Sequence, residues 1–453
     1  MSFHGPLADH APSARFGPTF NLPVKPQYGT GKRRIPLLLA LVLAVSGCAT
    51  VSSNTQPLDT PPEPPPLTSA EIMTRVFPGE GAPPAAKAPD GAALTLAQVR
   101  QIALEKNPSF AEYAARRAAA NAAVLQAIAY PNPDLEIGLD LFPSLFLPIE
   151  PPVKRQTRRA AAEAAKPVVD LTEDQFRTVL AADVGKAFCT VLYAEHAAAL
   201  SKEALNTEQQ IEQVVGRRVD AGEAPEIDLI RAQVETLKAS RMVQAQQRQD
   251  ATARVILNTL CGRALPSGFA LVDSLDQALA GADPEQAREV ALAQHPTLRR
   301  LDAILKQKEL AIQREQKAWQ PNLRVGVPLG VELPLGNRNQ GGIAAAQAEL
   351  QEAQAEQARI RQEVERDVET GVQAYEGARE QRAAFESGLR AAAAESLRIE
   401  TTMYEEGEVD LLQLLDVRRT ARQTESEYLQ ALYDAQIARI ELERAIGVGG
   451  IAK

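Results

Sequence analysis

The sequence predicts a mainly α-helical protein built from a duplicated unit that includes a small β part. First, only 4% of the 453 residues are aromatic and the chain has a single tryptophan, which favours long helices packed through narrow seams over several compact cores. Second, segments of the first half recur in the second half in the same order. Third, each half contains one short stretch in which apolar and polar residues alternate.

The duplication rests on pairs of matching dipeptides at a nearly constant offset of about 185 to 190 residues. The pairs are Asn107-Pro108 with His295-Pro296, Pro131-Asn132 with Pro321-Asn322, and Gly222-Glu223 with Gly407-Glu408. Each repeat is predicted to run helix, short strand pair, very long helix, turn, helix. This interpretation places the first repeat at 91–265 and the second at 280–447, with a short tail at 448–453.

The N-terminal region predicts export from the cytoplasm. Basic residues at 32–34 precede an apolar run at 37–45 that is too short to stay in a bilayer, so 1–47 is predicted to be a signal peptide with an N-terminal extension. The run ends in Val45-Ser46-Gly47-Cys48, which resembles the lipobox of bacterial lipoproteins. That resemblance implies acylation of Cys48, and Ala49 after it implies the outer membrane; the alternative is a signal with a chance cysteine. Residues 48–90 are rich in proline and are predicted to be a lipid-anchored tether, extended or lying on the body.

Enzymatic and nucleic-acid functions are disfavoured. The net charge is −9 and the pI is near 5.3, without a basic stripe after the first forty residues. The four histidines do not stand with other ligands at metal spacing, and we expect His295 to cap a helix locally. Cys189 and Cys261 are predicted to be buried and unpaired. No phosphate loop or nucleophile motif is found, so we predict neither an enzyme nor a cofactor beyond the covalent lipid.

The longest helix is predicted between residues 337 and 404, which contain no proline. Small or apolar residues at steps of three and four form one face, at Leu350, Ala353, Ile360, Val364, Val368, Val372 and Tyr375, with Gln357 as the polar member. About 68 helical residues would extend roughly 100 Å as a coiled coil in a rod, filament or tube. In the first repeat the matching helix covers 152–219, where Pro167 predicts a kink or break.

The alternating stretches lie at 134–141 and 323–327. One face is apolar and the other polar or charged, which suits a barrel wall between lipid and water. The alternative is a small hairpin that caps a coiled coil. About fifteen positions separate Pro321 from Gly336, so the second hairpin looks too short to cross a membrane fully with strands of about 9–11 residues.

These features together resemble the TolC family of outer-membrane efflux proteins. The likeness is strongest in LPLGNRNQGGIAAAQAEL (333–350) and YEEGEVDLLQLLDVRRT (404–420), and the segment 338–341 is most similar to the CzcC and CusC heavy-metal branch. The resemblance implies a homotrimer whose helices form an α-barrel continued by a short β-barrel in outer-membrane lipid. It also implies a passive duct for export, with heavy-metal cations as the expected cargo. A periplasmic membrane-fusion adaptor and an RND-type inner-membrane pump are the implied partners.

The same resemblance implies a periplasmic gate near the two glycine turns, Gly222 and Gly407. Carried over from these glycines, Asp228, Tyr404 and Asp416 match gate positions of the family. This chain departs from the family at Gln413, where an outer ring aspartate is expected, and at Val409, where an arginine is expected. Each residue also has an interpretation without a gate. Asp416 would then only interact favourably with the dipole of its helix, and Asp228 and Tyr404 would be a polar surface residue or part of the packing between helices.

Two other functions stay open from the sequence. One is the same duct for drugs or a secreted protein, because selection of cargo in such assemblies usually lies in the pump. The other is a lipid-anchored coiled-coil scaffold without a pore, which leaves the repeated alternating strands unexplained.

Overall fold

The structure is a computed structural model that describes residues 67–78, 93–137, 143–326, 330–331 and 336–448. All of them belong to one compact unit, Pro65–Lys453. The predicted signal peptide, Cys48 and most of the C-terminal tail lie outside the described residues.

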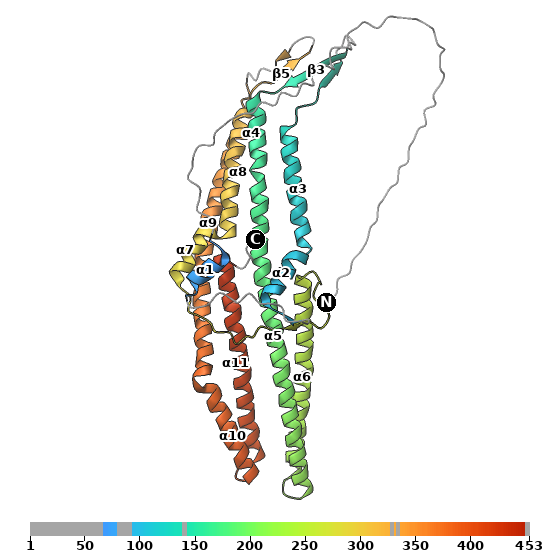
Figure 1. Cartoon of the computed structure of the whole chain (residues 1–453), viewed down its shortest axis with the longest axis vertical. Helices are drawn as coiled ribbons and strands as arrows, with labels where there is room; N and C mark the ends of the chain where they lie inside the picture. The colour runs from blue at the N-terminus through green and yellow to red at the C-terminus, as the bar shows by residue number, and fades with distance from the viewer. Residues whose placement is uncertain (1–66, 79–92, 138–142, 327–329, 332–335, 449–453) are drawn as a thin grey trace, which may run out of the picture. The chain divides into compact units, whose positions relative to one another are not determined.

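The described chain is mainly helical with a small β part, which confirms the predicted fold class (Figure 1). The helices are α1 (Ser69–Val76), α2 (Leu96–Lys106), α3 (Ser109–Ile128), α4 (Pro152–Glu163), α5 (Ala165–Asp220), α6 (Glu226–Leu260), α7 (Pro284–Gln294), α8 (Pro296–Ala318), α9 (Gln340–Ala384), α10 (Arg390–Glu406) and α11 (Leu411–Ile446), with a π-helical turn η1 (Phe385–Leu389) between α9 and α10. The strands are β1 (Ala93–Leu94), β2 (Asp134–Ile137), β3 (Pro143–Ile149), β4 (Ala270–Leu271), β5 (Leu323–Val325) and β6 (Gly330–Val331). No helix in the described ranges is both long and apolar enough to cross a membrane.

Two helix pairs form one end of the molecule, α5 with α6 and α10 with α11 (Figure 1). Above them α11 packs on α9, and α8 packs on α9, α5 and α4. The 56 residues of α5 give a helix of about 84 Å. Such long helices leave narrow seams in place of a globular core.

The break predicted by Pro167 is present, because α4 ends at Glu163 and α5 begins at Ala165. Pro167 therefore stands in the first turn of α5, where its missing N–H leaves no intrahelical hydrogen bond unmade. The prediction of one continuous helix over 337–404 is wrong. The helix is interrupted at Phe385–Leu389, where Gly388 has a φ of 144° that lies outside the helical region.

The larger sheet joins the strands of both halves in the order β2-β3-β5-β6, with antiparallel pairing of every neighbour. The register pairs Leu147 with Val325 and Ile149 with Leu323 on one face. On the other face the Arg324 guanidinium forms ion pairs with Glu136 and, at 3.9 Å, with Asp134. The alternation expected from the sequence is thus present in the described part of the strands, while Leu139, Leu141 and Val327 lie outside it.

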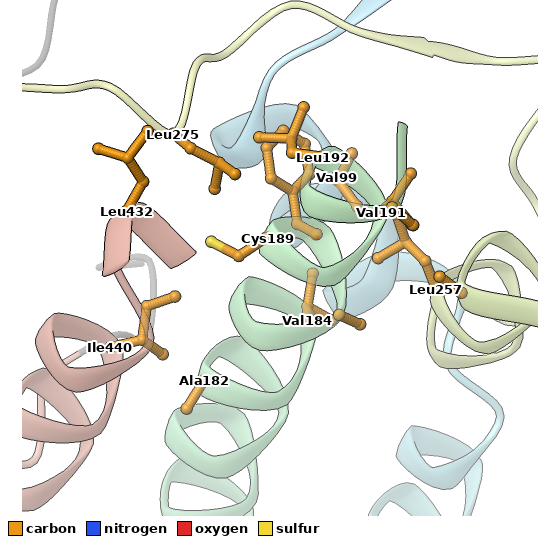
Figure 2. Packing of buried hydrophobic residues seen from close by; sticks show 14 of the residues in the cluster. Val99, Ala182, Val184, Cys189, Val191, Leu192, Leu257, Leu275, Leu432 and Ile440 are labelled. Atoms are coloured by element: carbon orange, nitrogen blue, oxygen red, sulfur yellow. The ribbon is translucent and has the colours of Figure 1, made fainter. Parts of the chain in front are cut away.

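The main core lies where α2, α5, α6 and α11 meet the segment around β4. Figure 2 shows Cys189 of α5 near Leu432 and Ile440 of α11. Burial raises the pKa of the Cys189 thiol to about 12 and that of Cys261 to about 11. Both cysteines are free and buried, as predicted, and both thiols stay protonated at neutral pH.

Within the proline-rich segment predicted as a tether, residues 69–76 form the helix α1, which packs on α7. A capping box between Thr68 and Glu71 starts this helix. Phe77, which follows it, is fully buried and meets the Tyr375 ring of α9 edge to face at 5.5 Å. This part of the segment is therefore fixed on the helical body.

His295 ends α7 and begins α8, where its Nδ1 accepts a hydrogen bond from the backbone N–H of Thr297 at 3.2 Å. The predicted capping role is confirmed. Burial lowers the pKa of this imidazole to about 4, so it stays neutral and keeps its acceptor.

Candidate functional site

The two glycine turns predicted from the sequence close the two helix pairs at the same end of the molecule (Figure 1). Gly222 has a φ of 74° and Gly407 a φ of 80°, the left-handed conformation that glycine adopts most readily. In both turns the second residue donates back to a carbonyl five residues earlier, Glu223 to Arg218 and Glu408 to Met403, each at 2.8 Å. This is the same Schellman-type ending of a helix in both halves.

The helix ends beside the turns share one apolar cluster, which we call the turn cluster. Its buried members come from all four helices, Ile211 and Val215 of α5, Ala232 of α6, Tyr404 of α10, and Leu411, Leu414 and Leu415 of α11. Val409, which stands where the resemblance implies an arginine, packs on this cluster as a partly buried side chain. The structure thus brings the two turn regions together through apolar contacts.

Tyr404 is one of the predicted gate residues and is only 9% exposed. The Arg218 guanidinium of α5 lies over its ring at 5.2 Å. This cation–π contact joins the last turn of α10 to the last turn of α5. Tyr404 therefore contacts the other helix pair by its ring face.

Asp228 and Asp416 both have an ion-pair partner on their own helix. Asp228 pairs with Arg231 at 3.1 Å and its side chain is 19% exposed. Asp416 pairs with Arg419 at 3.8 Å, and its side chain is 77% exposed. Asp416 is thus presented to solvent next to the turn cluster, whereas Asp228 also stands in the first turn of α6, where the helix dipole favours an acid.

Gln413 takes part in a helix cap. Its Oε1 accepts from the backbone N–H of Asp410 at 3.3 Å, and the Asp410 carboxylate accepts from the backbone N–H of Gln413 at 2.9 Å. This capping box fixes the start of α11. Gln413, at a position where the resemblance implies an aspartate, thus stabilises the start of the helix from which Asp416 projects.

An ion pair that the sequence analysis missed joins α5 to α11. Arg422 donates to the Glu208 carboxylate at 3.1 Å, and the Glu208 side chain is only 5% exposed. Burial raises the pKa of Glu208, against the lowering effect of Arg422 and Arg418. The Nε of Arg418 is itself buried without a hydrogen-bond partner, and burial lowers the pKa of its guanidinium.

The sequence did contain a signal for this pair. Glu208 precedes Ile211 by three residues and Val215 by seven, so it continues the apolar face of α5. A glutamate on such a face requires a buried cation. The identity of that cation could not be read from the sequence, because Arg418, Arg419 and Arg422 all stand on α11 in the right region.

A groove of 690 Å³ lies beside the turn cluster, between α6 and the α10–α11 pair. Its walls carry the apolar side chains Ile230, Val234 and Leu412 and the charged side chains Lys238 and Asp416. Ile227, Ile230, Val234 and Leu237 of α6 form a half-exposed stripe at steps of three and four. That spacing is the seam of a coiled coil without its partner in the single chain.

At the other end, apolar side chains of the larger sheet are exposed. Leu135, Leu145, Leu147, Ile149, Leu323 and Val325 are each between 39% and 65% exposed. Strands β2 and β6 are the edges of this sheet, so their outer backbone groups lack strand partners within it. Among the described residues no group of three histidine, cysteine or acidic side chains is arranged to hold a metal ion.

The chain shares its long-helix body, paired glycine turns and four-stranded sheet with solved outer-membrane channels, which shows the fold. Residues 289–448 match the family model for the outer membrane efflux protein. The matched range covers most of the second repeat.

One curated protein and two solved structures are similar to this chain over most of its length. The cobalt-zinc-cadmium resistance protein CzcC of Cupriavidus metallidurans is 24% identical over 398 residues, which cover 83% of this chain and 93% of CzcC. The structure of CusC aligns with a TM-score of 0.65 at 16% identity, over 82% of this chain and 99% of CusC. The open-state MtrE outer membrane channel of Neisseria gonorrhoeae aligns with a TM-score of 0.65 at 20% identity, over 82% of this chain and 95% of MtrE.

Proposed function

We propose that the chain is the outer-membrane channel of a tripartite efflux system and serves as a passive duct for heavy-metal cations. The observation that carries the proposal is the turn cluster, in which both helix pairs end together with Asp416 exposed beside it. The similarity to a cobalt-zinc-cadmium resistance protein over most of the chain supports the cargo.

The proposed assembly is a homotrimer. Closing the sheet with copies of itself would pair the edge strands β2 and β6, which lipid requires of any spanning sheet. The exposed leucine and valine face of the sheet would then contact lipid. The unpartnered α6 stripe offers the helical part a seam against a neighbouring copy.

At the opposite end the proposed partners are a periplasmic membrane-fusion adaptor and an RND-type pump. The groove between α6 and the α10–α11 pair combines apolar walls with charges of both signs, which suits a helical tip of the adaptor. Energy for transport would come from the pump. We further propose that lipid on Cys48 anchors the chain at the outer membrane.

The proposed gate uses Asp416. Three copies around an axis would focus negative potential at the opening, which attracts cations and repels anions. Arg419, 3.8 Å from Asp416, moderates that potential. Tyr404 and Asp228 are proposed to hold the helix ends that carry this ring, and Gln413 to fix the start of α11.

Growth of the native host with and without this chain tests the proposal. We expect loss of the chain to lower tolerance to cobalt, zinc and cadmium salts and to leave tolerance to hydrophobic drugs unchanged. Wild-type chain should restore tolerance, and Asp416→Asn should restore it less well because the ring loses its charge. Loss of drug tolerance alone would assign the duct to drugs. No change, together with a purified protein that conducts no ions in a planar bilayer, would leave the scaffold alternative.

A further inference from the structure

Several helix ends meet next to the larger sheet, where the chain passes between helices and strands (Figure 1). Lys154 in the first turn of α4 donates to the Gln320 carbonyl at 3.4 Å and to the Asn322 amide oxygen at 3.1 Å, which ties α4 to the end of α8. Asn339, just before α9, donates to the carbonyl and the carboxylate of Glu315 in α8, at 3.1 and 2.7 Å. The starts of α4 and α9 are thus fixed beside the end of α8.

This junction is basic in an otherwise acidic protein. The segments 150–163, 314–319 and 336–340 contain seven basic and three acidic side chains, whereas the whole chain has a net charge of −9. Each of the three acids forms an ion pair with a basic residue of the same junction, in the pairs Glu150–Arg158, Glu163–Arg159 and Glu315–Arg314. An excess of four positive charges remains.

The excess is carried by four side chains that form no ion pair within the described part of the chain. We call them the basic collar, and they are Lys154, Arg155, Lys317 and Arg338. Lys317 and Arg338 are exposed. The Arg155 guanidinium lies over the exposed ring of Tyr130 at 4.4 Å. The collar thus presents positive charge on three neighbouring helix ends.

Two members of the collar stand where they destabilise their own helix. Lys154 and Arg155 lie in the first turn of α4, which contains no acidic residue and begins at Pro151 without a side-chain cap. The positive end of the helix dipole repels cations at this position. An anion held against the collar would offset the repulsion.

A cavity of 560 Å³ lies on the helical side of the collar, between α3, α4 and α8. Tyr130, whose ring Arg155 covers, is part of its wall. Half of the lining residues are alanines, and the amides of Gln126 and Gln307 add groups that can bond to hydroxyls. The space beside Arg155 therefore suits an anionic headgroup that carries hydroxyl groups.

We propose that the basic collar binds anionic phospholipids of the leaflet that faces the periplasm. The phosphates would lie at Arg155, Lys317 and Arg338, and the acyl chains would lie against the exposed leucine and valine face of the sheet. Charge complementarity selects this partner, since unpaired cations attract headgroups with a net negative charge and gain less from zwitterionic ones. Inside the duct the same charges would repel the proposed cargo.

This inference rests on the proposed function, which places the sheet in outer-membrane lipid and the helix ends at the bilayer surface. Trp319 reports on that surface. It is the only tryptophan of the chain, follows Lys317 by two residues at the end of α8, and is 41% exposed. Lipids with brominated acyl chains quench tryptophan fluorescence on contact.

The experiment reconstitutes the full-length lipidated protein into phosphatidylethanolamine vesicles that contain the same minor fraction of brominated phosphatidylglycerol or brominated phosphatidylcholine. We expect phosphatidylglycerol to occupy the sites around Trp319 about fivefold more strongly than phosphatidylcholine. High salt should weaken this preference, because it screens the charges of the collar. The salt series tests the inference in the native chain, without any substitution.

The combined variant Arg155→Gln, Lys317→Gln and Arg338→Gln should lose the preference, with both lipids still quenching Trp319. Lys154 is kept, because its hydrogen bonds hold α4 on α8. The matched control is Lys202→Gln, Arg241→Gln and Arg248→Gln. It removes the same charge from exposed positions of α5 and α6 and should keep the preference.

Equal quenching by the two lipids in the native chain overturns the inference and leaves the channel function intact. A preference that is independent of salt, or that survives in the collar variant, overturns it as well. Quenching by neither lipid in a protein that floats with the vesicles has the same meaning, because a neighbouring copy or the lumen would then face the collar. A protein that does not float with the vesicles contradicts the outer-membrane channel itself.

Discussion

Glu208 of α5 and Arg422 of α11 form an ion pair that links the two helix pairs. Removing Glu208 leaves the Arg422 guanidinium, which is 35% exposed, without this partner, and removing Arg422 leaves the buried Glu208 carboxylate with only the weaker effect of Arg418. We expect Glu208→Leu and Arg422→Leu each to lower the free energy of unfolding by about 1–3 kcal/mol. The double variant should lose less than the sum, with a coupling energy of about 1 kcal/mol.

Denaturant titrations of the purified protein, followed by circular dichroism, measure this coupling. The exposed pair of Arg359 and Glu363 on α9 is the matched control, for which we expect a coupling of about 0.3–0.5 kcal/mol. Equal coupling energies at the two sites would show that the Glu208 pair has no special role.

The raised pKa of Glu208 also predicts a pH dependence. Burial raises the pKa of the Glu208 carboxyl above its ordinary value of 4.5. Glu235 raises this pKa further, whereas Arg422 and Arg418 lower it. The folded chain therefore binds the carboxyl proton more tightly than the unfolded chain does. The contribution of this group to stability is therefore greatest below pH 4.5 and is lost as the pH rises through the raised pKa. Relative to Glu208→Gln, the wild-type melting temperature should fall as the pH rises across this window. A constant or growing wild-type advantage would contradict the assignment.

At the scale of elements, the two glycine turns end their helices by backbone conformation alone. An added Cβ at Gly222 would meet no atom within 4 Å, so its replacement costs only the left-handed φ. We expect Gly222→Ala to lower the free energy of unfolding by about 1–2 kcal/mol. Gly216→Ala, inside α5 and in ordinary contact with Leu229, should be neutral or raise it by up to about 1 kcal/mol. Equal effects in denaturant titrations of the two variants would refute this account of the turn.

The two long helices differ in how visible their breaks are in sequence. Pro167 signals its break, because proline lacks an N–H and clashes in a helix interior but is tolerated in a first turn, so a new helix begins just before it. Gly388 carries no such signal, since glycine is tolerated in a helix and the apolar steps of three and four end before it. The ion pairs on either side of the interruption, Arg382 with Asp276 and Arg390 with Glu425, join residues that are far apart in sequence.

For the whole molecule, the proposed trimer predicts a specific image. Electron microscopy of the lipidated, detergent-extracted protein should show a three-fold hollow cylinder with a detergent belt at one end. The reason is that the exposed face of the sheet and the α6 stripe both require partners that one chain does not supply. A solid or monomeric rod without a belt would exclude the channel and favour the scaffold.

The sequence by itself determined the fold class, the two glycine turns, the proline break and the unpaired cysteines. These follow from local chemistry or from repeated patterns, which a linear chain displays directly. Only the tertiary structure decided that Glu208 pairs with Arg422 and that Tyr404 lies under Arg218. It also decided that the helix predicted over 337–404 is interrupted at Gly388. The two contacts depend on which faces of distant helices meet. A repeat of 3.6 residues shows which residues share one face of a helix, but it does not show which helix packs against that face.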